Sequence, residues 1–203
     1  MSRYVSGYTE AKIDGKWYCI DFFQYDMTGQ IQHIPCIEGQ STIYYTLRDD
    51  CNIEHISVPT DLSDQVRAAC TGDEGRLIGE DETSWNPWHM VKGSWFASVD
   101  LRQPEYCGFF PRQAVVDYLC NPGKNDINED DMLFPEEYHE LSDEEKKAYQ
   151  YFEYTPAGGH RAILRDFKQA VTDRVSAWNE EIGWKKGNQR ISLSDVRVLL
   201  IME

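Results

Sequence analysis

The sequence predicts an α+β fold, in which an N-terminal antiparallel sheet is followed by three to four helices and completed by a C-terminal strand that returns to the sheet. Residues 3–24 contain two aromatic-rich runs on either side of Asp14 and Gly15, and Asp-Gly in this position is a strong signal for a β-hairpin. Residues 160–182 carry apolar side chains at helical spacing. The closing run 196–202 is apolar and typical of a buried strand.

Three shorter helices are expected between these regions, over about 62–70, 111–120 and 142–154. The first begins at Asp61 or Ser63, because either side chain can accept the free amide hydrogens of a first helical turn. The second has Pro111 where a first turn tolerates proline, and the third opens with an S-x-x-E capping box at Ser142. Residues 41–49 fit either a strand or the first turns of a helix.

A chain of 203 residues can form one large domain or two small ones, and of these we expect a single domain over residues 1–203. The stretch 121–135 is acidic and rich in turn-forming residues, so we interpret it as a loop and a candidate flexible insertion. Hydrophobic residues make up 41% of the chain and aromatic residues 13%, which supplies enough apolar area for a folded core.

The strongest bulk property is the net charge of −15, from 35 acidic and 20 basic residues. Such a charge repels the phosphates of DNA and RNA, so we do not expect a general nucleic-acid binder. One interpretation is that the charge keeps the protein in solution. The other is that acidic side chains imitate phosphates and occupy a basic nucleic-acid site on another protein.

Cysteine usage and the N-terminus indicate the compartment. The six cysteines form no C-x-x-C pair, and the N-terminal residues lack the apolar core of a signal peptide. We therefore expect free thiols, mostly buried, and a cytoplasmic location. No run approaches the roughly 18 apolar residues of a membrane span, so no membrane partner is expected.

Residues 84–95, SWNPWHMVKGSW, hold the densest group of unusual side chains. Trp85, Trp88 and Trp95 either pack as core under an irregular segment or line a ligand cleft. In a cleft, their indole faces would stack on a planar group such as a nucleobase. The other candidate ligand-binding residues are His89, Lys92, Ser94, Arg102 and Arg112.

Lys92, Arg102 and Arg112 place positive charge near this stretch, in a chain that is otherwise acidic. They either contact the phosphate oxygens of a ligand or are ordinary surface cations. No glycine-rich phosphate-binding fingerprint accompanies them.

His89 is the candidate general base, with Asp81, Glu82 or Asp100 as a carboxylate that would orient it. A lone histidine beside aromatic residues is more often structural. The chain lacks the H-x-H and H-E-x-x-H patterns of metal sites and the G-x-S-x-G pattern of serine hydrolases. We therefore expect no metal and no cofactor, and the sequence leans against an enzyme.

Three segments resemble a family of uncharacterised accessory proteins from tailed phages and prophages. They are the G-K-W of residues 15–17, the V-P-x-D-L-S-x-x-V-R of residues 58–67, and a looser match formed by His89 with residues 94–95 and 100–101. In the third segment, two additional residues separate the histidine from Ser-Trp. The resemblance covers roughly the first half of the chain and implies phage origin and an accessory role in the infected cell.

These observations favour an anti-defence protein that binds and sequesters a nucleotide-like small molecule. The alternatives are an enzyme that cleaves such a nucleotide with His89 and a nearby carboxylate, and an acidic decoy that inhibits a nucleic-acid-binding host protein. The expected partners are therefore a small-molecule ligand or a host defence protein, without direct nucleic-acid binding. A homo-oligomer is a further candidate state, because most soluble oligomers are formed by copies of one chain. Turnover of the ligand would separate the enzyme from the sequestering protein.

Overall fold

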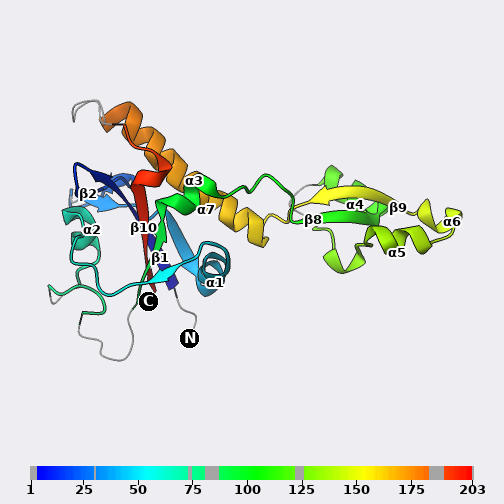
Figure 1. Cartoon of the computed structure of the whole chain (residues 1–203), viewed down its shortest axis with the longest axis horizontal. Coiled ribbons are helices and arrows are strands. Elements are labelled where there is room, and N and C mark those ends of the chain that lie inside the picture. Colours follow the sequence, from blue (N-terminus) through cyan, green and yellow to red (C-terminus); the bar gives the residue numbers. More distant parts are fainter. Residues whose placement is uncertain are drawn as a thin grey trace. The chain divides into compact units, whose positions relative to one another are not determined.

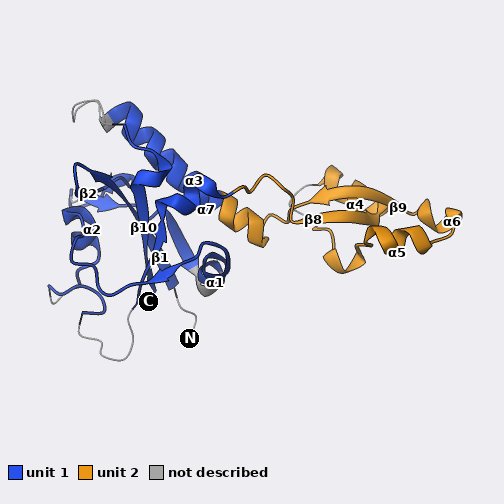
Figure 2. Ribbon diagram, viewed as in Figure 1, with its two compact units in different colours: residues 1–99, 166–203 blue, residues 100–165 orange. Residues whose placement is uncertain are grey.

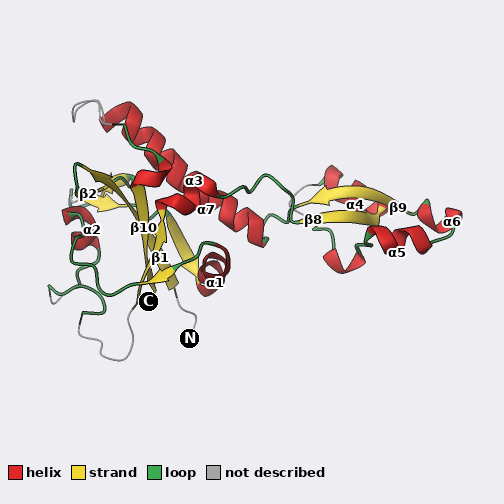
Figure 3. Ribbon diagram, in the orientation of Figure 1, coloured by secondary structure: helices red, strands yellow, loops and turns green. Residues whose placement is uncertain are grey.

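The computed structural model describes residues 4–29, 31–72, 75–80, 87–121, 126–182 and 190–202. Helices and an antiparallel sheet are both present (Figure 3), which confirms the predicted α+β class. Contacts divide the chain into two compact units: unit 1 is residues 1–99 with 166–203, and unit 2 is residues 100–165 (Figure 2). The expected single domain stays a prediction, because a compact unit need not fold by itself.

Unit 1 is built on a six-stranded antiparallel sheet (Figure 1) with the order β2-β1-β10-β7-β6, in which β5 also pairs with β1. Its strands are β1 (Tyr4–Ile13), β2 (Lys16–Cys19), β5 (Ile37–Gln40), β6 (Glu54–His55), β7 (Trp88–Lys92) and β10 (Val196–Met202). All seven residues of β10 are buried and the strand lies between β1 and β7, which confirms the predicted C-terminal strand.

The predicted N-terminal hairpin is confirmed as β1 and β2, joined at Asp14 and Gly15. Both residues have positive φ, 49° and 81°, as a two-residue hairpin turn with the right-handed twist of its strands requires. A separate two-stranded ribbon follows, formed by β3 (Phe23–Tyr25) and β4 (Ile31–His33).

The helices of unit 1 are α1 (Ser41–Asp50), α2 (Asp64–Ala69), α3 (Gly93–Ser98) and the larger part of α7 (His160–Ala177), which begins in unit 2. Residues 41–49, for which strand and helix were both open, are helical. Ser63 caps α2 by accepting from the Val66 amide, which confirms the expected helix start. α7 continues as the π-helix η2 (Trp178–Ile182), and the 3-10 helix η3 (Leu193–Asp195) precedes β10.

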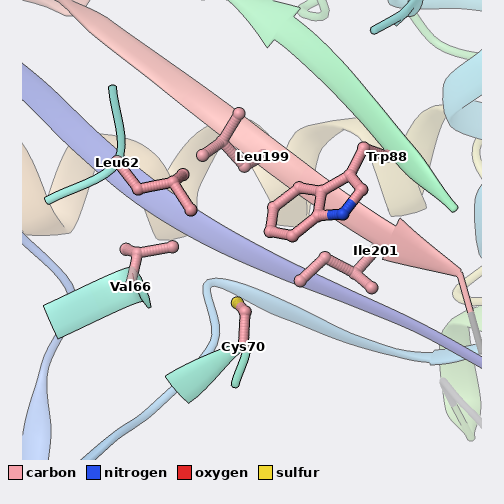
Figure 4. Close-up of a cluster of buried hydrophobic side chains, with 6 residues drawn as sticks. All are labelled: Leu62, Val66, Cys70, Trp88, Leu199 and Ile201. Atoms are coloured by element: carbon pink, nitrogen blue, oxygen red, sulfur yellow. The ribbon is translucent and has the colours of Figure 1, made fainter. Parts of the chain in front are cut away.

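One face of the unit 1 sheet is covered by α2 (Figure 4). The cluster of buried side chains on this face contains Leu62, Val66, Cys70, Trp88, Leu199 and Ile201. Leu199 and Ile201 are two residues apart on β10, so both point to this face of the strand. We call it the α2 face.

Unit 2 contains the hairpin-like pair β8 (Tyr106–Pro111) and β9 (Tyr149–Tyr154), the helices α4 (Arg112–Cys120), α5 (Pro135–Glu140) and α6 (Asp143–Lys146), and the 3-10 helix η1 (Glu129–Asp131). Its own core holds Phe110, Val115, Ile127 and Tyr154. The helix expected at 111–120 is confirmed. Of the expected acidic loop at 121–135, residues 122–125 lie outside the described residues, and the remainder includes η1.

The helix predicted over 142–154 is wrong beyond Lys146. The capping box at Ser142 is present, but it determines only where a helix begins. From Tyr149 on, the side chains alternate with a period of two: Phe152 and Tyr154 face the core, whereas Tyr151 is 54% exposed and Glu153 is also exposed. Pairing with β8 satisfies this strand pattern, so tertiary contacts override the helix propensity of the preceding residues.

A buried ion pair joins the two chain ends in unit 1. Glu10 on β1 lies directly opposite Arg197 on β10, and Arg197 Nε donates to Glu10 Oε2 over 2.8 Å. Arg197 Nη1 also donates to Asp61 Oδ1 over 3.0 Å, and its guanidinium lies 3.9 Å from the centroid of the Trp17 ring. The Ser63 amide donates to the second Glu10 oxygen over 2.7 Å.

This network contains residues from two of the three segments that resemble the phage family. Trp17, from the G-K-W segment, donates its Nε1–H to Asp61, from the V-P-x-D-L-S segment, over 2.9 Å. The Asp61 carboxylate thus receives both the indole N–H and the Arg197 guanidinium, which holds the pKa of Asp61 below its usual range although partial burial opposes this shift. These residues therefore have a structural role.

A second buried ion pair links α7 to the strand ends. Arg174 on α7 donates to Asp21, and its Nη2 donates to the carbonyl oxygens of Ile34 and Pro35 over 3.1 and 3.0 Å. The other Asp21 oxygen accepts from the Thr9 amide over 2.8 Å. Every charged group in this pair is therefore hydrogen-bonded, as burial requires.

All six cysteines fall within the described residues, and none forms a disulfide, as expected. Cys36, Cys51 and Cys70 are buried, Cys19 is half-buried, and Cys107 and Cys120 are exposed. Of the helices in the described part of the chain, none has the length and apolar character needed to span a membrane.

We expect Arg197→Ala to lower the free energy of unfolding by about 3–5 kcal/mol, because it leaves Glu10 buried without its counter-charge. Urea denaturation of the variant and the wild type measures this loss. Arg102→Ala is the matched control, since Arg102 pairs with Asp100 at the surface. Equal midpoints for the two variants would contradict the role assigned to Arg197.

Candidate functional site

A cavity of about 810 Å³ opens on the α2 face of unit 1. Its floor is formed by Ser6 and Tyr8 of β1 and by Glu38 of β5, which pairs with Ser6 across the sheet. Ser6 and Tyr8 lie opposite Ile201 and Leu199, whose side chains belong to the α2-face core. The cavity is therefore next to the hydrophobic cluster of this face, and its volume is within the range of small-molecule sites.

Two walls rise from this floor. One is α2, which contributes Asp64, Gln65, Ala68 and Ala69. The other is the ribbon with the residues that follow it, which contributes Gln24, Asp26, Ile31, Gln32, His33, Ile34 and Pro35. The alanines leave open space beside α2, and the glutamines supply polar groups from both walls.

The polar groups of the cavity are amides and carboxylates. Gln24, Gln32 and Gln65 each carry N–H donors and a carbonyl acceptor, and Gln24 Nε2 donates to Gln32 Oε1 over 3.4 Å, so these two amides share part of their hydrogen-bonding capacity. Asp26, Glu38 and Asp64 supply one carboxylate from each side of the cavity. None of the described residues that line it is a lysine or an arginine, so the cavity favours ligands that donate hydrogen bonds and disfavours phosphate.

His33 of the ribbon lies beside a thiol at the edge of the cavity. Its Nδ1 is 3.5 Å from Cys19 Sγ. Burial lowers the pKa of His33, so the ring is neutral at neutral pH. Burial, with the nearby Asp21 carboxylate, raises the pKa of the Cys19 thiol far above its ordinary value. Cys19 is therefore a protonated thiol, and its S–H lies within reach of both Asp21 Oδ2, at 3.9 Å, and His33 Nδ1.

The protonation state of this pair decides what the cavity can do. A cysteine nucleophile reacts as the thiolate, which a positive or hydrogen-donating environment stabilises. Here burial and a carboxylate favour the thiol instead. The edge of the cavity thus carries a neutral imidazole and a protonated thiol, and this arrangement supports binding better than nucleophilic catalysis.

The candidate tryptophans do not share one environment. Trp88 is fully buried in the α2-face core and donates its Nε1–H to the Ile78 carbonyl over 2.7 Å. Trp95 is half-buried on α3, donates to the Asp50 carbonyl over 2.8 Å and meets Phe96 edge to face. Trp85 lies outside the described residues. Trp88 thus fits the core interpretation, since its ring has no exposed face for stacking.

The candidate cations also have protein partners. Lys92 is exposed at the end of β7 and forms an ion pair with Glu54. Arg102 pairs with Asp100 in unit 2. Arg112, also in unit 2, donates to the carbonyl oxygens of Lys147 and Tyr149. Ser94 is exposed on α3. The described residues therefore show each cation in a local interaction of its own.

His89 lies on β7 in a buried hydrogen-bonded group. Its Nδ1 is 3.2 Å from the Pro87 carbonyl, and its Nε2 is 3.0 Å from Tyr44 Oη and 3.1 Å from His55 Nδ1. With Nδ1–H donating to the Pro87 carbonyl, the single lone pair of Nε2 accepts from either Tyr44 Oη–H or His55 Nδ1–H. Burial lowers the pKa of His89, and His55 adds to this shift. Both ring nitrogens are engaged, so His89 is better placed to orient the strands than to accept a proton from a substrate.

Within the described ranges, no three side chains of histidine, cysteine, aspartate or glutamate are grouped so as to hold a metal ion. The pair His55 and His89 has Tyr44 as its third neighbour, and a neutral tyrosine donates rather than binds a metal in this geometry. Asp81 and Glu82, two of the carboxylates considered for His89, lie outside the described residues.

Comparisons of the chain with protein-family models, with curated proteins and with solved structures find no match. The residues of the site are therefore interpreted from their geometry.

Sequence reasoning missed the cavity, because its lining comes from short segments of β1, the ribbon, β5 and α2. The spacing of Gln24, Gln32 and Gln65 carries no recognisable pattern. The only available signal was the α2 start at Ser63, which places Asp64 and Gln65 on the first turn of a helix. Residues 84–95 differ from the rest of the chain in composition alone. The residues that line the cavity, in contrast, are brought together only by the tertiary structure.

The lowered pKa of His89 predicts loss of stability in mild acid. Below about pH 6.5 the unfolded histidine takes up a proton that the folded one resists, so the free energy of unfolding falls with pH by up to about 1.4 kcal/mol per unit for this group. Urea midpoints between pH 7.5 and 5.5 measure this slope. His89→Gln should have a shallower slope and the exposed His139→Gln should keep it; identical slopes would remove His89 as the cause.

We expect Trp88→Ala to lower the free energy of unfolding by about 3–5 kcal/mol, because it empties a fully buried site in the core. Trp95→Ala removes a half-buried ring and should cost less. Denaturation followed by circular dichroism gives both values. If Trp88→Ala were as stable as the wild type, Trp88 would not be a core residue and would again be a candidate ligand-binding residue.

Proposed function

We propose that the protein binds and retains a small molecule that contains a nucleobase, with the base in the cavity between α2 and the ribbon. The supporting observation is the combination of a cavity of about 810 Å³ with three glutamine amides and three carboxylates on its walls. A glutamine amide can pair with the donor and acceptor edge of adenine, and a carboxylate accepts from the amino group of cytosine.

Rings at the cavity wall support the same ligand class. Tyr8 on the floor and His33 on the ribbon both line the cavity, and aromatic side chains stack on bases with about 1–3 kcal/mol per base. This assigns to Tyr8 and His33 the stacking role that the sequence suggested for the tryptophans.

The charge of the cavity favours a nucleoside over a nucleotide. Three carboxylates would repel a phosphate group, and the cations proposed to hold one are engaged elsewhere. The ligand of this proposal is therefore a base or nucleoside, or a nucleotide whose phosphates stay outside the cavity.

Binding without cleavage is the preferred activity. The buried His89 has both ring nitrogens hydrogen-bonded, and the Cys19 thiol beside the cavity is held protonated. If the resemblance to phage accessory proteins reflects origin, retention of a nucleobase-containing signal would serve as an anti-defence function in the host cytoplasm.

The test is a thermal-shift and calorimetry panel of adenosine, guanosine, cytidine and uridine with their 5′-monophosphates. A ligand at 100 times its Kd adds about 2.7 kcal/mol of stability, which raises the Tm by roughly 5–10 °C for a chain of this size. We expect this shift from at least one nucleoside and a smaller one from its monophosphate. Ligand recovered by heat denaturation should be chemically intact.

Two matched pairs of variants locate the binding. Ala68→Phe fills the cavity and Gln65→Leu removes one of its amides, so both should abolish the shift. Ala97→Phe on α3 and Gln169→Leu on α7 change exposed helical positions elsewhere and should keep it. A shift that survives Ala68→Phe would place the ligand elsewhere, and a recovered product in place of ligand would make the protein an enzyme.

A further inference from the structure

The two-stranded sheet of unit 2 has one covered face and one face that carries exposed aromatic rings. Phe110, Phe152 and Tyr154 point to the core of unit 2. Side chains alternate along a strand, so Phe109, Tyr151 and their neighbours point to the opposite face. We call this surface, formed by Cys107, Phe109, Tyr151 and Glu153 with Tyr138 of α5, the outer aromatic face.

The rings of this face are held in fixed positions. Phe109 and Tyr138 stack with centroids 3.7 Å apart and planes 2° from parallel. Tyr151 meets Phe109 at 74° with centroids 5.7 Å apart. Tyr151 is 54% exposed, and Phe134, which precedes α5, is 55% exposed. Rigid rings of this kind bind a partner at a low cost in conformational entropy.

Exposed carboxylates lie on the elements that carry or adjoin the rings, and one of them, Glu153, accepts from Tyr151 Oη over 3.4 Å. α5 contributes Glu136 and Glu140, α6 contributes Asp143, and β9 contributes Glu153, all of them exposed. Nearby cations are fewer, and Lys147 is already paired with Glu144. The outer aromatic face is therefore set among predominantly negative elements, whose exposed carboxylates we call its rim, and this charge complements a basic partner.

The protein itself shows how this surface receives a cation. Lys146 Nζ lies 5.9 Å from the centroid of the Tyr138 ring and also donates to the His139 carbonyl oxygen over 3.1 Å. A lysine or arginine is attracted to the face of an aromatic ring, and neighbouring carboxylates add to the attraction. The more exposed Tyr151 ring offers an equivalent position to a side chain from another molecule.

We propose that the outer aromatic face of unit 2 binds a lysine- or arginine-rich segment of a partner protein. The rings take the cationic side chains, and the carboxylates of α5 and β9 pair with them at the rim. This occupant follows from charge complementarity, because a nucleic acid or an acidic peptide would be repelled by the same rim. The interaction is separate from the cavity of unit 1 and does not depend on its ligand.

The probe for this surface is a fluorescein-labelled peptide of eight arginines, measured by fluorescence anisotropy with the full-length protein at about 0.1 M salt. We expect binding that Tyr151→Ala weakens about fivefold, since the cation loses its ring. Tyr151→Phe keeps the ring and should bind as the wild type does. Glu136→Gln with Glu140→Gln should weaken binding by a similar factor.

Matched controls separate this surface from the general acidity of the chain. Tyr45→Ala removes a comparably exposed tyrosine, 46% against 54%, from α1, and Glu180→Gln with Glu181→Gln removes the same charge from η2. Both controls should bind the peptide as tightly as the wild type. The proposal is overturned if the peptide does not bind, or if the controls weaken binding as much as the unit 2 variants do.

Discussion

The cross-strand pair of Glu10 and Arg197 is the interaction on which the architecture of unit 1 depends. It joins the first strand to the last, over 187 positions of sequence, at the centre of the sheet. Both side chains are buried, so each charge requires the other. The second oxygen of Glu10 accepts from the amide of Ser63, the residue that caps α2. The pair therefore determines the strand register and the start of α2 together.

The two buried ion pairs hold the two walls of the cavity in position. Glu10 positions α2 through Ser63, whereas Arg174 binds the carbonyl oxygens of Ile34 and Pro35, which line the opposite wall. A cavity between two elements collapses unless each is fixed independently, because close packing is otherwise favourable. Here buried charges fix both walls, and this explains why a chain of modest size can keep such a volume open.

Local signals predicted the elements of unit 1 well. The hairpin at Asp14 and Gly15, the α2 cap at Ser63 and the C-terminal strand each depend on a turn, a cap or an apolar run within a few residues. The sequence could not predict β9, because its strand pattern becomes decisive only beside β8. Nor could it show that Trp88 is core, since composition does not reveal whether an indole has a partner such as Ile78. The cavity was unpredictable for the same reason, as its polar groups are gathered by tertiary structure alone.

Unit 2 is inserted in the sequence of unit 1, and contacts within unit 1 hold the two ends of this insertion together. Unit 1 leaves off at Val99 and resumes at Asp166, and Lys168 Nζ donates to the Val99 carbonyl over 2.7 Å. Phe167 packs edge to face on Phe96 next to this bond. The two ends of the insertion are thus held together by contacts within unit 1, so changes on the surface of unit 2 leave the core of unit 1 intact. A chain built in this way can carry a polar cavity in one unit and an acidic, aromatic surface in the other. The charged residues of each can then change without affecting the other.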